Sequence, residues 1–240
     1  DTLQVFVGTH RFHNFTSKMS PLDVKSRRFI VSFDVVDTME LGCMQYVRLR
    51  VVGASFLLNQ IRKMIAGALM VVRGHITEDQ LRKALDPTRL VSVPMAPGLG
   101  LMLDAVDYSF YHANLEGQKG TGNRRDQLLW TEEQEVIQSF KREVILPSLA
   151  AEEEKEHITF QWLQDLERVG VPGFLTSLER PSLSDAEIRS IFGKSERKKA
   201  FKEAKYQQQQ QQQQSDRSAE VGASASTTTR SEEDTLTGNS

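Results

Sequence analysis

Apolar and polar side chains alternate over residues 29–36 and again over residues 44–52, which predicts two β-strands. The intervening residues 37–42 are polar, so we expect them to form the loop of a hairpin. A third strand is predicted over residues 101–110. The positions that share a face are Phe29, Val31, Phe33 and Val35 in the first strand, and in the second Val47, Leu49 and Val51 on one side against Tyr46, Arg48 and Arg50 on the other.

Apolar residues on nearly every side of the segment 56–73 predict a long, buried helix. Gly74 is its predicted stop, because glycine is the residue that most often ends helices. A capping box beginning at Thr77 predicts a second helix, which ends before Pro87. Residues 2–7 are expected to be the last turns of another helix.

These elements predict an α+β fold, in which half of an antiparallel sheet packs on the long buried helix. Residues 1–113 form this folded part, residues 114–180 a linker and helical extension, and residues 181–240 a disordered tail.

The extension is expected to open with a polar linker, residues 114–127, followed by amphipathic helices over 128–146 and 152–168. The tail is first basic, then holds an unbroken glutamine run at 207–214, and ends rich in serine and threonine. Such a sequence has too little apolar surface to offset the entropy lost on ordering, so we predict disorder.

The composition excludes several classes of protein. Cys43 is the one cysteine in the 240 residues, so neither an internal disulfide nor a cysteine-based zinc site can form. The longest apolar run covers nine residues, 64–72, whereas a membrane span needs about 20. We therefore expect no membrane span, and we also expect no signal peptide. Because the chain opens with Asp1 and not methionine, we expect that it continues upstream in the complete protein.

The net charge of -2 hides an asymmetry. Residues 1–113 carry 13 Lys and Arg against 10 Asp and Glu, and residues 114–240 carry 17 against 22. The positive surplus of the first part is compatible with nucleic-acid binding, although ordinary soluble domains carry a similar surplus.

Three polar side chains, Asn59, Arg62 and Lys63, interrupt the long apolar helix. Their spacing of three and four residues places them near one helix face. A buried arginine keeps its proton and needs an anionic partner, so Arg62 either forms a structural ion pair, lies at a surface edge, or serves a functional site. The candidate structural partners are Asp34, Asp104 and Asp107.

Three segments resemble the TruA-type tRNA pseudouridine synthases, and most closely their eukaryotic nuclear and mitochondrial branch. They are GTHRFHNFTS at residues 8–17, GASFLLNQIRKM at 53–64 and VPMAPGLGLML at 93–103. Their order and spacing fit that family, and the similarity covers about residues 1–112. Asn59 stands where many relatives carry a histidine.

The resemblance implies an enzyme that isomerises uridine within RNA, with tRNA as the expected partner. In such enzymes an aspartate acts on a flipped-out uridine while the base is detached from the ribose and rejoined through ring carbon 5. By the motif, Arg62 is the arginine that pairs with this aspartate and keeps it ionised. A tyrosine stacks on the base, and no metal or organic cofactor is implied.

The family's aspartate lies upstream, in a segment reading approximately GRTDKGV, as does the tyrosine. No such segment occurs in residues 1–240. We therefore expect this chain to be the C-terminal half of such an enzyme, inactive by itself, with the missing N-terminal half as a partner. The alternatives are a non-catalytic RNA-binding or partner-binding module from a split or degenerate gene, and an unrelated protein with coincidental motifs.

The segment 8–17 contributes His10, His13 and Asn14, which either hydrogen-bond locally or contact RNA. Two histidines three residues apart also resemble a metal site, but too few further ligands are present in the sequence for zinc.

By the resemblance, residues 94–101 are expected to shape one wall of the uridine pocket; the alternative is that they form a rigid buried turn. Arg48 and Arg50 either contact phosphates or lie on a solvated face. We expect a nuclear or mitochondrial protein that is not secreted, and the basic stretch 194–205 is either a nuclear signal or a solvated charge run. The complete set of predicted RNA- or substrate-binding residues is His10, His13, Asn14, Arg48, Arg50, Asn59, Lys63, Pro97 and Gly98.

Overall fold

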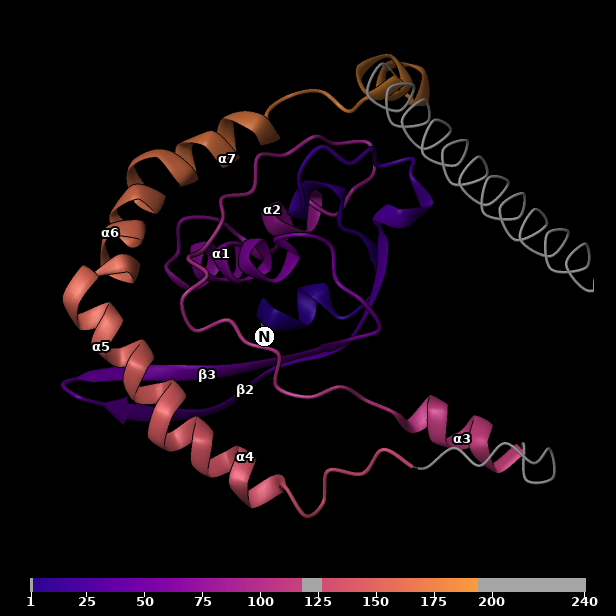
Figure 1. The fold of residues 1–240 in the computed structure, drawn as a ribbon. Helices are drawn as coiled ribbons and strands as arrows, with labels where there is room; N and C mark the ends of the chain where they lie inside the picture. The colour runs from indigo at the N-terminus through magenta and orange to yellow at the C-terminus, as the bar shows by residue number, and fades with distance from the viewer. Residues whose placement is uncertain (1, 118–126, 194–240) are drawn as a thin grey trace, which may run out of the picture. The chain divides into compact units, whose positions relative to one another are not determined.

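The computed structural model describes residues 2–117 and 127–193 (Figure 1). Two compact units divide the chain, Asp1–Ser184 and Asp185–Ser240. In the second unit the described residues, 185–193, are helical. Most of the predicted linker and the tail beyond residue 193 lie outside the described residues, so the predictions made for them stay predictions.

A three-stranded antiparallel sheet, in the order β1-β2-β3, forms one layer of the first unit. β1 (Gly8–Arg11) pairs with the start of β2 (Arg27–Leu41), and β2 continues into a long hairpin with β3 (Met44–Gly53) (Figure 1). Together with the helices described below, this sheet confirms the predicted α+β class. The sequence did not predict β1, because its four residues show no apolar alternation.

The prediction of a hairpin loop over residues 37–42 is wrong, because residues 37–41 belong to β2. Leu41 pairs directly with Met44, so only Gly42 and Cys43 form the turn. Gly42 has a φ of 62°, the left-handed conformation that such two-residue turns require. The polar residues before it stay in the strand because their side chains reach solvent on this part of the hairpin.

A bulge in β2 changes which of its apolar side chains are buried. The pairing with β3 shifts register between Ile30 and Ser32, so Val31 is the extra residue. Ile30 and Phe33 are buried, whereas Phe29 and Val31 are half exposed. The prediction that Phe33 shares a face with Phe29 and Val31 is therefore wrong, because strict alternation holds only for a regular strand.

The long helix begins four residues later than predicted. α1 spans Gln60–Val72, because Asn59 has a left-handed φ of 63° and keeps the preceding residues out of the helix. The buried side chain of Gln60 accepts a hydrogen bond from the Leu57 amide at 2.8 Å, which closes the entering turn. At the other end Gly74, with a φ of 74°, follows the helix as predicted.

α2 (Glu78–Lys83) begins with the predicted capping box. The Thr77 hydroxyl accepts from the Gln80 amide at 3.2 Å, and the Gln80 side chain accepts from the Thr77 amide at 2.8 Å. Leu81 then packs against α1 where Gly67 leaves room for it, since a Cβ on Gly67 would lie 2.8 Å from the Leu81 Cδ1 atom. The two helices therefore approach closely at this glycine.

The hydrophobic core lies between the sheet, these two helices and η1 (Thr2–Phe6), a 3₁₀ turn where the sequence predicted the end of a helix. Phe6, Phe12, Phe15 and Phe33 are buried together. The rings of Phe6 and Phe15 meet edge to face with their centroids 5.4 Å apart, an arrangement that aromatic pairs prefer.

The prediction of a final strand over residues 101–110 is wrong. Residues 101–108 have no regular secondary structure, and α3 (Ser109–Gly117) follows them. Leu103 is 80% exposed and Phe110 81% exposed. A strand needs a hydrogen-bonded neighbour, and within the described residues the sheet ends at β1 and β3.

The extension is helical in two runs, and the break between them lies at His157, which has a φ of 50°. Two helices were predicted, but with the break between residues 146 and 152. Leu166, Val171 and Phe174 of the second run are buried in the same core as the sheet and α1. No helix in the described ranges is long and apolar enough to cross a membrane. The first run comprises α4 (Gln134–Phe140), the π-helical turn η4 (Lys141–Ile145) and α5 (Leu146–Glu156), and the second α6 (Ile158–Asp165), the π-helical turn η5 (Leu166–Gly170) and α7 (Val171–Leu178).

Candidate active site

The guanidinium of Arg62 is fixed by backbone atoms of the loop that follows α2. Arg62 lies in the first turn of α1, and its Nε donates to the Ala96 carbonyl at 2.7 Å. The Ala96 amide donates in return to the Arg62 carbonyl at 3.2 Å. Nη1 also lies 3.4 Å from the Asn59 side-chain oxygen, a long and weak hydrogen bond. The side chain is half-buried and held along one edge.

The loop over residues 91–100 lies beside this arginine, and its predicted role as a wall of a uridine pocket stays a prediction. Its backbone is irregular. A Cβ built on Gly98 would lie 3.8 Å from the Arg62 Cζ, so the backbone of Gly98 runs alongside the guanidinium. Pro97 joins this glycine to Ala96. The proline and glycine content of the loop was the sequence feature that pointed to this part of the site. Nothing in the sequence indicated that the Ala96 carbonyl accepts a hydrogen bond from Arg62.

Arg62 has no carboxylate partner within the described part of the chain. Each of the three proposed structural partners is engaged elsewhere: Asp34 accepts from Gln4, Asp104 pairs with Lys141 and Arg50, and Asp107 accepts from the Ser109 amide. The hydrogen bond from Lys141 and the neighbouring positive charges lower the pKa of Asp104. The outer edge of the Arg62 guanidinium is therefore open to an anion that these residues do not supply.

Lys63 turns away from Arg62 and holds the chain that precedes β2. Its ammonium donates to the carbonyls of Asn14 and Thr16 at 3.1 and 3.2 Å. Burial lowers the pKa of Lys63. These contacts give Lys63 a structural position, and they place its charge beside carbonyl oxygens, not beside the guanidinium of Arg62.

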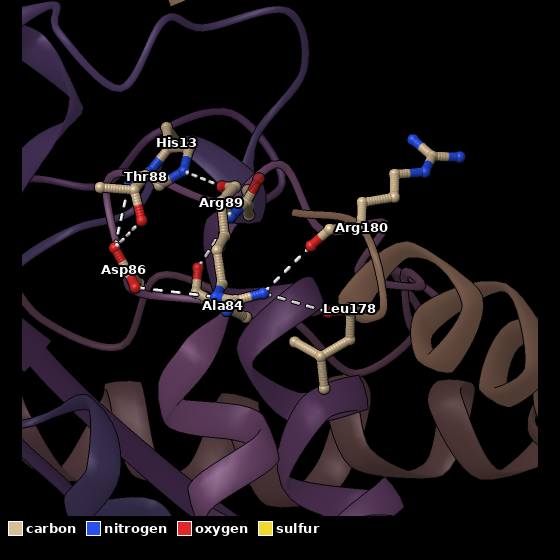
Figure 2. Close-up of polar contacts among 8 residues, drawn as sticks. His13, Ala84, Asp86, Thr88, Arg89, Leu178 and Arg180 are labelled. Carbon is tan, nitrogen blue, oxygen red and sulfur yellow. Dashed lines mark hydrogen bonds and ion pairs between the residues drawn. The ribbon is translucent and has the colours of Figure 1, made fainter. Parts of the chain in front are cut away.

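His13 and Asn14 are buried in the 3₁₀ turn η2 (His13–Phe15), where both meet the backbone of the loop after α2. Figure 2 shows the His13 ring directed at the Arg89 carbonyl, which lies 2.8 Å from Nε2. Burial lowers the pKa of His13. The Arg89 side chain in turn donates to the carbonyls of Leu178 and Arg180, at 3.1 and 3.2 Å.

Asn14 makes three hydrogen bonds in the same cluster. Its amide nitrogen donates to the carbonyls of Ala84 and Arg89, each at 2.9 Å, and its oxygen accepts from the Val91 amide at 3.0 Å. His10 is less buried, and its Nε2 lies 2.9 Å from the Val7 carbonyl. Only His10 bonds locally; His13 and Asn14 bond to residues 70 or more positions away in the chain.

Arg48 and Arg50 are exposed on β3, and each has an acidic neighbour. Arg48 pairs with Asp37 across the hairpin. Arg50 lies 3.6 Å from Asp104, which is also paired with Lys141. Their positive charges are therefore partly neutralised, and the prediction that they contact phosphates stays a prediction.

Metal ligands do not gather at this site or elsewhere in the described ranges, since no three His, Cys, Asp or Glu side chains there are placed to hold a metal ion.

Comparison with known proteins gives the site its context. Residues 3–109 match the family described as tRNA pseudouridine synthase. The chain is 33% identical over 164 residues to the Pseudouridylate synthase 1 homolog of Mus musculus, and 34% identical over 164 residues to that of Homo sapiens, a span that is 68% of this chain in both cases. It is 34% identical over 158 residues, 66% of its length, to tRNA pseudouridine synthase 1 of Schizosaccharomyces pombe.

The chain spans well under half the length of these relatives. The matched region amounts to 38% of the mouse protein, 37% of the human protein and 29% of the S. pombe protein. The matches extend beyond the segment 1–112 on which the resemblance was recognised, because 164 aligned residues reach into the helical extension or beyond.

Proposed function

Because residues 3–109 belong to the tRNA pseudouridine synthase family, we propose that this chain is part of an enzyme that isomerises uridine in tRNA to pseudouridine. In this proposal Arg62 is the arginine that pairs with the catalytic aspartate. The aspartate itself comes from a segment outside residues 1–240, since no GRTDKGV-like segment occurs in them. The rest of that enzyme is then the partner of this chain.

One observation carries the proposal: a half-buried guanidinium is held along one edge by Ala96 and Asn59, and no carboxylate of the described residues pairs with it. Arginine stays protonated and its planar fork matches a carboxylate. An aspartate placed against the open edge would have its pKa lowered by the adjacent positive charge and would remain ionised at neutral pH. Such an arrangement suits a carboxylate that must act as an anion on a uridine.

The chemistry divides between this chain and the aspartate. The bond between the ribose and the ring nitrogen of uracil breaks, the base turns over, and a bond forms between the same ribose carbon and ring carbon 5. Carbon 5 then loses its proton and the freed ring nitrogen gains one, so the product is an isomer of the substrate. Arg62 takes no proton in this sequence; it orients the aspartate and stabilises its negative charge. The loop over residues 96–98 lies beside the guanidinium and so would border the detached base.

The test is a count of pseudouridine in an unmodified tRNA transcript, by mass spectrometry. The complete gene product that contains residues 1–240 should form pseudouridine, and Arg62→Ala should nearly abolish it while tRNA binding persists. Residues 1–240 alone should form none at any concentration. Activity of the isolated chain would show that one of its own carboxylates does the chemistry.

The absence of a GRTDKGV-like segment from residues 1–240 also favours a second candidate, a non-catalytic module that binds RNA or a partner protein. The same assay separates the two. A complete gene product that binds tRNA without forming pseudouridine supports the module, whereas turnover that depends on Arg62 supports the enzyme. We further propose a nuclear or mitochondrial location, which imaging of the tagged complete protein would test.

A further inference from the structure

An open groove lies at the corner where β1 meets the start of β2. Its volume is about 460 Å³. Beside it, the turn η3 (Val24–Ser26) leads into β2. Three of the six lining side chains are cationic and none is acidic. The lining residues are Thr9, Val24, Lys25, Arg27, Arg28 and Phe29.

The three cations of this groove have no acidic partner in the part of the chain that the structure describes. Lys25 and Arg27 are exposed. Arg28 is half-buried; its Nη1 donates to the Arg27 carbonyl at 2.9 Å, and its Nε is shielded from solvent without a hydrogen-bond partner. The groove thus differs from β3, where Arg48 and Arg50 both have carboxylates beside them.

The backbone that carries these cations is fixed by local bonds. Asp23 caps η3 by accepting from the Lys25 amide at 2.8 Å, so the nearest carboxylate in the sequence is already engaged. Arg11 donates to the Pro21 carbonyl, which ties β1 to the segment before η3. In the sheet, Arg27 pairs with Arg11 and Arg28 with His10. The cations therefore project from a rigid corner at an edge of the sheet.

Two apolar side chains flank the cations. Val24 is 77% exposed and Phe29 50% exposed. Unpaired cations that hold a phosphate backbone, next to an exposed aromatic ring on which a base can stack, are the combination used by surfaces that bind single-stranded nucleic acid. The Phe29 carbonyl also accepts from the Ala54 amide at 3.3 Å, which ties this corner to the segment that leads into α1 and Arg62.

We infer that this groove binds the phosphodiester backbone of RNA, with Lys25, Arg27 and Arg28 against phosphates and Phe29 against a base. The inference rests on the proposed function for the identity of the polyanion, and it adds a contact apart from Arg62. The groove supplies affinity, and Arg62 supplies catalysis. Neutralising the groove weakens binding to every RNA sequence alike, because phosphate contacts carry no sequence information.

The experiment compares the chain 1–240 with a variant of it carrying Lys25→Gln, Arg27→Gln and Arg28→Gln, using an unmodified tRNA transcript as the probe. Three lost phosphate contacts should weaken binding by roughly tenfold to a hundredfold at about 0.1 M salt, and should lower the slope of log K against log salt by about 2. The matched control, Arg82→Gln with Lys83→Gln and Arg142→Gln, removes three exposed charges from other elements and should change affinity by less than about twofold.

Equal weakening by both variants would overturn the groove proposal, because it would mean that net charge alone sets affinity. So would unchanged affinity and salt slope in the groove variant. If the triple variant has a lower melting temperature than wild type, the double variant Lys25→Gln, Arg27→Gln replaces it, because it changes exposed residues only. This double variant should reduce the magnitude of the slope of log K against log salt by a little over 1. Failure of the proposed function looks different: the complete gene product then forms no pseudouridine, while the groove-dependent binding remains.

Discussion

Arg62 and Ala96 bind each other through two reciprocal hydrogen bonds, from the guanidinium Nε to the Ala96 carbonyl at 2.7 Å and from the Ala96 amide to the Arg62 carbonyl at 3.2 Å. Both the backbone and the side chain of the arginine are therefore tied to one residue of the facing loop. An arginine so fixed has lost its rotamer freedom before any anion arrives, which favours binding in one geometry.

Arg62→Lys should lower turnover of the complete gene product almost as much as Arg62→Ala, by about 100-fold or more. A lysine has no Nε that can bond Ala96 while a second nitrogen meets a carboxylate, so its charge arrives in the wrong place. Single-turnover rates of pseudouridine formation measure the effect. A lysine variant within about threefold of wild type would mean that the charge alone matters.

Asn14→Ala should destabilise the folded chain by about 2–4 kcal/mol, because the Ala84 carbonyl and the Val91 amide lose their Asn14 partner, while the Arg89 carbonyl keeps only His13. Urea unfolding of the variant and of Asn114→Ala, which removes an exposed amide from α3, provides the comparison. The Asn114 variant should stay within about 0.5 kcal/mol of wild type. If the two variants were equally stable, the contacts of Asn14 would contribute nothing.

His13 should make stability depend on pH. Burial lowers its pKa in the folded state, so the unfolded chain takes up the proton first as pH falls. Its contribution is complete above the unfolded pKa of about 6.5 and is lost as pH falls from there toward the lowered folded value, by at most about 1.4 kcal/mol per pH unit. The nearby charges of Asp86 and Arg11 act in opposite directions on this pKa.

The free energy of unfolding, measured between about pH 5.5 and 7.5, should therefore fall toward acid in wild type. His13→Gln should reduce the dependence of the free energy of unfolding on pH. The other histidines are present in both proteins, so the difference between the two reports His13. Identical slopes would show that His13 titrates normally in the fold.

Gly42→Ala should cost about 1 kcal/mol, although an added Cβ meets nothing within 4 Å. The cost is strain, because Gly42 has a φ of 62° in the hairpin turn. Gly173→Ala is the matched change: its Cβ is equally free, but the position is helical in α7, so alanine should stabilise by up to about 1 kcal/mol. Thermal melts of the two variants should move in opposite directions.

Local signals in the sequence were sufficient for several elements. The capping box of Thr77 and Gln80 and the stop at Gly74 were correctly predicted, because caps and helix ends are set by residues within one turn of each other. The family resemblance was likewise readable from three short segments, and the comparisons confirm it. The sequence also singled out Arg62 as an arginine in an apolar setting that called for a partner.

Tertiary structure alone decided where the polar side chains point. His13, Asn14 and Lys63 were predicted to contact RNA, a prediction that stays untested, and in the structure they bond to carbonyl groups far away in the chain, such as that of Arg89. Every residue has a carbonyl, so such an acceptor leaves no mark in the sequence.

The bulge at Val31 and the unpaired segment 101–108 were unpredictable for a related reason. Apolar alternation reports that a strand can form, but pairing with a neighbour decides whether it does and in which register. The sequence of this chain thus determined the capping box of α2, the stop at Gly74 and the family resemblance, and it singled out Arg62 as a candidate. Long-range backbone contacts determined which of the remaining candidates are free to meet a ligand.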